Sequence, residues 1–186
     1  MLRISTSGFV GYKKNGIIKG FYNMVNSQYG ELGLEVLGKF NIHSKEELKH
    51  FFTNKLNLSV QGQKEHLFNQ KYIWRSNWLV QDIKMKDDHN FLYNKFCSFG
   101  YVYNLDDDTL DLYRGFFKHP QTMKEQNKLK IKKIFIEEEK KFYTHLVYSI
   151  KRDEIERVEK LFLNWNGVNV SYEGLYKERD FMEQKI

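Results

Sequence analysis

The chain has little cysteine and little proline, the residues that cross-link a fold or interrupt its helices and strands. It contains one cysteine and one proline in 186 residues. A single thiol excludes an internal disulfide and is typical of a reducing compartment, where a residue such as Cys97 is usually a small buried hydrophobe. No apolar run is long enough to cross a membrane, and the N-terminus lacks the pattern of a signal peptide. We therefore expect a cytoplasmic protein that does not contact a membrane.

Residues that would form a metal or cofactor site are also scarce. With one cysteine, no thiolate cluster can form, and none of the six histidines pairs with a second histidine and a carboxylate at zinc-site spacing. Three adjacent aspartates, Asp106, Asp107 and Asp108, lack the spaced ligands of a calcium loop and are better explained by turn chemistry. We expect no metal and no cofactor, and no catalytic triad stands out.

Both signs of charge are present, with a modest excess of lysine and arginine. The balance is 30 Lys+Arg against 24 Asp+Glu, a net charge of +6, and the charges are interspersed. This basic character permits an acidic partner without requiring one. The length suits one domain over residues 1–166, followed by a C-terminal extension over 167–186 that we expect to contain a short helix.

The local patterns predict two hairpins within a sheet. Asn15-Gly16 lies between two apolar runs and tolerates the positive φ angles of a tight turn. The aspartate turn at 106–108 likewise separates two stretches in which aromatic and apolar residues alternate. Predicted strands cover 9–12, 17–22, 99–105, 110–115, 131–136 and 142–150, with a further strand considered near 56–60.

Helical spacing appears between and after these strands. Apolar residues over 32–40 follow helical spacing, and Ser44 and Glu47 form a capping box that starts a second helix. Residues 57–95 are ambiguous and favour helix, while Asp153 resembles the N-cap of a last helix that ends near Asn166. The predicted fold is a single α+β domain, an antiparallel sheet with helices packed mainly on one face.

The first hairpin also carries a family resemblance. The segment Gly8–Gly16, GFVGYKKNG, continues into Tyr22-Asn23, Ser27 and the Gly30–Gly33 motif, and the later hairpin over 101–115 matches as well. These residues resemble a family of uncharacterised phage and bacterial proteins. Where the family pattern has arginine, histidine and aspartate, this chain has Ser7, Met24 and Asn26. The resemblance therefore implies an uncharged pocket, with Ser7, Tyr22, Asn23, Asn26 and Ser27 as its candidate binding residues.

The resemblance also suggests an analogy to N-terminal-nucleophile amidohydrolases. In that class, a hydroxyl or thiol at the mature N-terminus attacks, and the terminal amine serves as the base. Ser5, Thr6 or Ser7 would become terminal only by self-cleavage, because the bulky Leu2 normally prevents removal of Met1. This enzymatic interpretation is the second alternative, after nucleic-acid binding.

Two basic segments are candidate nucleic-acid contacts. Lysine or arginine beside aromatic side chains can stack single-stranded bases, as in Lys71, Tyr72, Trp74 and Arg75. The densest lysine patch, over 124–133, includes Lys128, Lys130, Lys132 and Lys133 and can contact phosphates. Core packing of Trp74 with Trp78, and a sheet edge protected by lysine, are the structural alternatives.

Taken together, these patterns favour a binding protein over an enzyme. The leading hypothesis is a phage-encoded, non-enzymatic protein that inhibits a host defence protein or nucleoprotein complex in the host cytoplasm. Nucleic-acid binding is the first alternative. A homodimer through an unpaired sheet edge is also compatible with the pattern.

Overall fold

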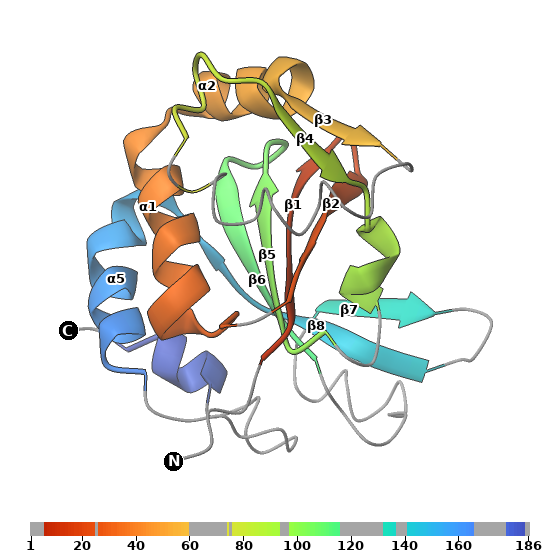
Figure 1. Ribbon diagram of the computed structural model, residues 1–186. Helices are drawn as coiled ribbons and strands as arrows, with labels where there is room; N and C mark the ends of the chain where they lie inside the picture. Colours follow the sequence, from red (N-terminus) through yellow and green to blue (C-terminus); the bar gives the residue numbers. More distant parts are fainter. Residues whose placement is uncertain are drawn as a thin grey trace.

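A six-stranded sheet organises the protein. The computed structural model describes residues 6–24, 26–59, 74, 76–93, 97–115, 132–136, 141–165 and 178–184. The strand order is β2-β1-β5-β6-β8-β7 (Figure 1). The strands are β1 (Gly8–Lys14), β2 (Ile17–Asn23), β5 (Phe99–Asn104), β6 (Thr109–Arg114), β7 (Lys132–Ile136) and β8 (Lys141–Ile150). Every neighbouring pair is antiparallel except the parallel pair β1/β5. This arrangement confirms the predicted single-domain α+β fold.

The first hairpin has the turn that its sequence predicts. Asn15 and Gly16 adopt φ angles of 52° and 76°, in the left-handed region that this dipeptide tolerates. Farther down the hairpin, Gly11 and Gly20 lie opposite each other across the two strands. A Cβ atom at either glycine would collide with the ring of Phe9 and with a backbone carbonyl. The two glycines therefore let a buried aromatic ring lie flat on the hairpin.

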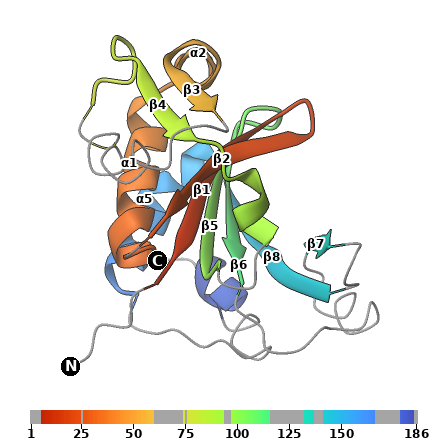
Figure 2. The same cartoon turned by 45° about the vertical axis from the view of Figure 1, so that its right-hand side comes forward.

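Helices cover one face of this sheet. They are α1 (Leu34–Ile42), α2 (Lys45–His50) and α5 (Ile155–Leu163), with π-helical turns η1 (Tyr29–Gly33) and η2 (Phe51–Lys55). Helices α1 and α5 lie side by side against the sheet (Figures 1 and 2). The predicted capping box is present, because Glu47 N donates to Ser44 Oγ and Ser44 N donates to the Glu47 carboxylate. The main hydrophobic core lies between these helices and the sheet.

The opposite face of the sheet has a thinner cover. A short 3-10 helix, η3 (His89–Tyr93), packs there with Leu92 fully buried. Around it lies a smaller cluster that contains Phe9, Cys97 and Val102. Burial raises the pKa of the Cys97 thiol, so the prediction that this cysteine is a core residue is confirmed.

The expectation of helix over 57–95 is wrong for the two strands in this region, although η3 is a short 3-10 helix. Strands β3 (Leu56–Ser59) and β4 (Ile83–Lys86) form a separate two-stranded parallel sheet. On β4 the buried Ile83 and Met85 alternate with Lys84, which is exposed. The strand considered near 56–60 is therefore present. Its pairing was not predictable because the partner lies beyond a connection of more than twenty residues.

The last helix begins differently from the prediction. Asp153 is not its N-cap: residues Arg152–Glu154 form a 3-10 turn, and Lys151 N donates to the Glu154 carboxylate. The helix α5 then ends at Leu163. Farther on, residues 178–182 are helical, while the predicted domain boundary at 166 lies outside the described residues. None of the helices in the described part of the chain has both the length and the apolar character to cross a membrane.

Candidate interaction surface

The polar residues predicted for a pocket near the N-terminus serve mainly to close a turn. Asn23 Nδ2 donates to Ser27 Oγ over 2.8 Å, and Ser27 N donates to Thr6 Oγ1 over 3.0 Å. The Ser27 carbonyl accepts from the hydroxyl of Tyr101 over 2.7 Å. Asn23, Ser27 and Thr6 are all buried. The structure thus brings these residues together, and their polar groups bond to one another.

The other residues of that prediction are dispersed around the same turn. Asn26 is exposed at a φ of 57°, and its carbonyl accepts from Leu32 N. The carbonyl of Ser7 accepts from Ser98 N over 3.0 Å. The ring of Tyr22 packs on Phe91 with 4.4 Å between centroids. Burial, and then the nearby Asp88 carboxylate, raise the pKa of Tyr22.

The aromatic and basic segment is described only in part. Trp78 is buried in the main core, and Trp74 packs on it with 5.9 Å between ring centroids. The interpretation of Trp78 as core is confirmed. Of the lysine patch, Lys132 and Lys133 lie on β7, an edge strand of the large sheet. The candidates outside the described residues are Lys71, Tyr72, Arg75, Lys128 and Lys130.

Each of the three aspartates in the turn between β5 and β6 accepts hydrogen bonds from a different protein donor, and two of these donors lie in other parts of the molecule. Asp106 accepts from Asn15 N over 2.7 Å and from Gly16 N over 3.0 Å, so it holds the tip of the first hairpin. These two amides keep the pKa of Asp106 below its ordinary value. Asp107 accepts from Asn104 Nδ2 over 3.0 Å. The turn chemistry expected for these aspartates is thus what the structure contains.

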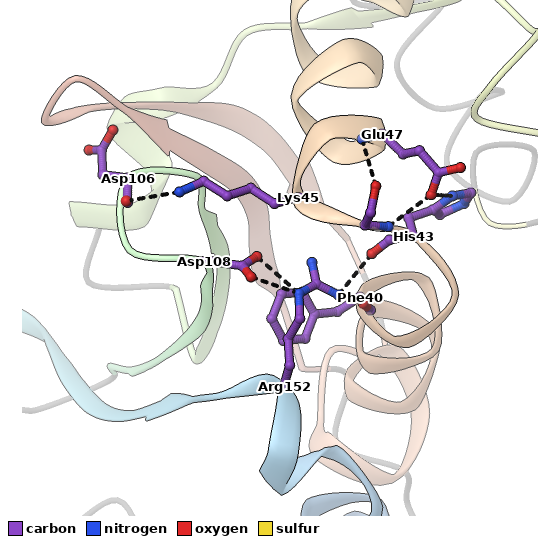
Figure 3. Close-up of polar contacts among 8 residues, drawn as sticks. Phe40, His43, Lys45, Glu47, Asp106, Asp108 and Arg152 are labelled. Carbon is purple, nitrogen blue, oxygen red and sulfur yellow. Dashed lines mark hydrogen bonds and ion pairs between the residues drawn. The ribbon is translucent and has the colours of Figure 1, made fainter.

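Asp108 completes the turn by binding Arg152 (Figure 3). Arg152 Nε lies 3.0 Å and 2.9 Å from the two carboxylate oxygens. The same guanidinium donates through Nη1 to the carbonyls of Phe40 and His43 and lies over the ring of Phe40. Those carbonyls are at the C-terminal end of α1, where a cation is favoured by the helix dipole. Arg152 therefore fixes the end of α1 against the aspartate turn.

Beside this end of α1 lies a stack of rings. His43 is parallel to Trp78 with 5.8 Å between centroids, and Trp78 stacks on Phe51 at 4.1 Å. Lys39 Nζ lies 5.0 Å from the Trp78 ring centroid and donates to the Ser76 carbonyl. Burial, and then the charge of Lys39, lower the pKa of His43. The stack is thus a largely buried support at the end of α1.

Three large apolar side chains are exposed around this stack. Ile42 precedes His43 in the chain, and Leu79 and Val80 follow Trp78. Their relative exposures are 66%, 39% and 66%. We call Ile42, Leu79 and Val80 the corner patch. Each of the three lies one or two positions along the chain from a ring of the stack, and exposed apolar side chains on a rigid support are typical of a protein interaction site.

The corner patch was not predicted from sequence, although a signal for it was present. The buried apolar residues of α1 are Val36, Leu37 and Phe40, and Ile42 falls off this helical stripe. An apolar residue off the stripe, in the last turn of the helix, points away from the core that the stripe faces. The exposure of Leu79 and Val80 had no comparable signal, because it depends on how their turn packs against α1.

A second arginine site was also missed. Arg114 Nε lies 2.8 Å and 2.9 Å from the two oxygens of Glu178, and both side chains are buried. Tyr29 donates its hydroxyl to Glu178 over 2.5 Å. Burial, and then the Glu178 carboxylate, raise the pKa of Tyr29 well above its ordinary value. This pair connects the C-terminal helical residues 178–182 to the centre of the sheet.

Comparison with known proteins does not assign the chain to a family. No protein-family model, no curated protein and no solved structure that was compared with it gives a match. Within the described part of the chain, no three histidine, cysteine, aspartate or glutamate side chains converge in the way that a metal ion requires.

Proposed function

We propose that this is a phage-encoded, non-enzymatic binding protein that inhibits a host defence protein or nucleoprotein complex. The single observation that carries the proposal is the corner patch. Its side chains lie on elements that are fixed by Arg152, by the ring stack and by Lys39. A surface that is already rigid loses little conformational entropy when it binds.

The chemistry of the patch favours a protein partner. Isoleucine, leucine and valine offer no hydrogen bonds to bases or phosphates, and their burial gives roughly 25 cal/mol per Å² of apolar area. The same ring stack has charged groups of both signs beside it: Lys39 lies over Trp78, and the carboxylate of Glu47 lies 3.8 Å from His43 Nδ1. An apolar centre within a polar rim is the usual anatomy of a protein interface.

The chain offers a matched pair of variants to test the proposal. Ile42 and Leu163 are the last residues of α1 and α5 and are 66% and 65% exposed. Ile42→Asp and Leu163→Asp make the same change at two helix ends, and only the first is in the corner patch. We expect the Ile42→Asp variant to lose the host protein that wild type captures from nuclease-treated lysate, with capture by Leu163→Asp unchanged. Equal capture by both variants contradicts the proposal.

Direct binding of nucleic acid is the second candidate. It is supported by the net charge of +6 and by the position of Lys132 and Lys133 on an edge strand of the sheet. Binding through phosphates weakens steeply as salt rises. A titration with DNA and RNA at several salt concentrations tests it, and affinity that is insensitive to salt contradicts it.

A further inference from the structure

The tip of the first hairpin is a second exposed element, separate from the corner patch. In Figure 2 the hairpin β1–β2 extends from the body of the molecule, with the β5–β6 turn beside it. Ile17, the first residue after the turn, is 62% exposed. It lies opposite Lys14, and Lys19 is exposed two positions farther along β2. The tip thus presents one apolar side chain among lysines.

The charge of this tip is of one sign within its own hairpin. No aspartate or glutamate occurs before Glu31, whereas Lys13, Lys14 and Lys19 all lie on the hairpin. Lys45 also reaches the tip region, because its Nζ donates to the Asp106 carbonyl over 3.2 Å. The neighbouring turn contributes Asp106, Asp107 and Asp108, and Asp108 is paired with Arg152. The hairpin itself therefore carries only positive charge, and the carboxylates near it are those of this turn and of Asp87 and Asp88, which pair with His89 and Lys86.

The tip is also held in one conformation. The Asp106 carboxylate accepts from both backbone amides of the Asn15-Gly16 turn, and Leu105 N donates to the Lys13 carbonyl over 2.9 Å. On the other side, Lys14 Nζ donates to Thr53 Oγ1 over 3.3 Å. A hairpin tip fixed from two sides needs little reordering on binding.

We infer that the hairpin tip is a docking element for an acidic protein surface that has an apolar pocket for Ile17. Complementary charge selects the partner and speeds encounter, while the buried isoleucine supplies affinity. The exposed Ile17 favours a protein over a nucleic acid, because a phosphate backbone provides no apolar pocket. The inference rests on the proposed binding function and assigns it a second contact with a stated chemistry.

The test uses the full chain and a displayed library of random peptides as the probe. We expect wild type to enrich peptides that combine aspartate or glutamate with a large apolar residue. The double variant Ile17→Ser/Lys19→Glu removes the apolar anchor and reverses one charge. The matched control is Leu163→Ser/Lys160→Glu, which makes the same two changes on α5. We expect the tip variant to bind the enriched peptides at least about tenfold more weakly than wild type or the control.

The outcomes separate this inference from the proposed function. If Ile42→Asp abolishes capture of the host protein while the tip variant changes neither that capture nor peptide binding, the inference fails and the proposed function stands. If neither variant changes capture of the host protein and the tip variant also binds the enriched peptides as wild type does, both fail. Enrichment of basic or neutral peptides, no enrichment at all, or tighter tip-dependent binding of oligothymidylate than of any peptide also overturns the inference. Thermal unfolding of each variant shows that a loss of binding is not a loss of fold.

Discussion

Two arginine–carboxylate pairs connect distant parts of this chain in contrasting environments. In the Arg114–Glu178 pair, each side chain is 2% exposed. In the Arg152–Asp108 pair, the side chains are 30% and 33% exposed. The first joins the sheet to the C-terminal helical residues, and the second joins the aspartate turn to the end of α1.

The difference in environment indicates different roles. A buried pair is costly to desolvate, and the loss of one partner leaves the other charge without compensation. A half-exposed pair remains in contact with water, which screens its charges. Such a pair therefore adds little to the free energy of unfolding, and its main effect is to fix the relative positions of the elements it joins. The buried pair should therefore determine whether the fold persists, and the half-exposed pair should determine how the corner patch is positioned.

The largest expected effect comes from breaking the buried pair. Glu178→Ala leaves the Arg114 guanidinium without its carboxylate and removes the acceptor of Tyr29, so we expect a loss of roughly 3–5 kcal/mol in the free energy of unfolding. Denaturant unfolding followed by circular dichroism measures this change.

The double variant Arg114→Met/Glu178→Met sharpens the same measurement. Removing both charges replaces a buried pair with apolar packing, so much of the lost stability should return. A double variant as unstable as Glu178→Ala would mean that packing of these side chains, rather than an uncompensated charge, dominates.

A smaller effect is expected at the half-exposed pair. Arg152→Ala removes the donors to Asp108 and to the two carbonyls at the end of α1, and we expect a loss of about 1–2 kcal/mol after allowance for solvent screening. Arg152→Lys should not restore it, because lysine lacks the planar fork that reaches all three acceptors. Full recovery of stability in the lysine variant would show that positive charge alone holds the end of α1 against the aspartate turn.

The histidine held by Arg152 should make stability depend on pH. Burial lowers the pKa of His43 below the ordinary value of 6.5, so protonation favours the unfolded chain. Its contribution is present above about pH 6.5 and is lost as pH falls through that value towards the folded-state pKa. We expect His43→Gln to lose less stability than wild type between about pH 7.5 and about pH 5. A His43→Gln variant that keeps the wild-type slope would contradict this assignment.

The smallest effect should come from a pair that is wholly on the surface. Lys160 and Glu156 lie one turn apart on α5, with side-chain exposures of 54% and 84%. We expect Lys160→Ala to change the free energy of unfolding by only about 0.3–0.5 kcal/mol. This variant gives the baseline for the comparison, and a loss as large as that at Arg152 would remove the distinction between the pairs.

Local chemistry predicted much of the fold. The Asn15-Gly16 turn, the aspartate turn and the capping box at Ser44 depend on neighbours within a few residues, and each is present. The partners of Asp106 and Asp108, by contrast, depend on contacts across the fold: Asp108 and Arg152 are 44 positions apart in the chain. The burial of Glu178 is a similar case. Its segment reads as charged and exposed until the tertiary structure supplies Arg114 as its partner.

The hydrogen bonds from the tip of the first hairpin to Asp106 have a consequence for the order of folding. The hydrogen bond from Asn15 N to Asp106 spans 91 positions in the chain. The hairpin itself is local and forms within microseconds. Its hydrogen bonds to Asp106 close a long loop, so they form only after the β5–β6 hairpin has been made. During synthesis at about 5–20 residues per second, that wait is roughly 5–20 seconds. A newly made chain therefore has its basic hairpin tip without these hydrogen bonds for some seconds, until the turn between β5 and β6 has been synthesised.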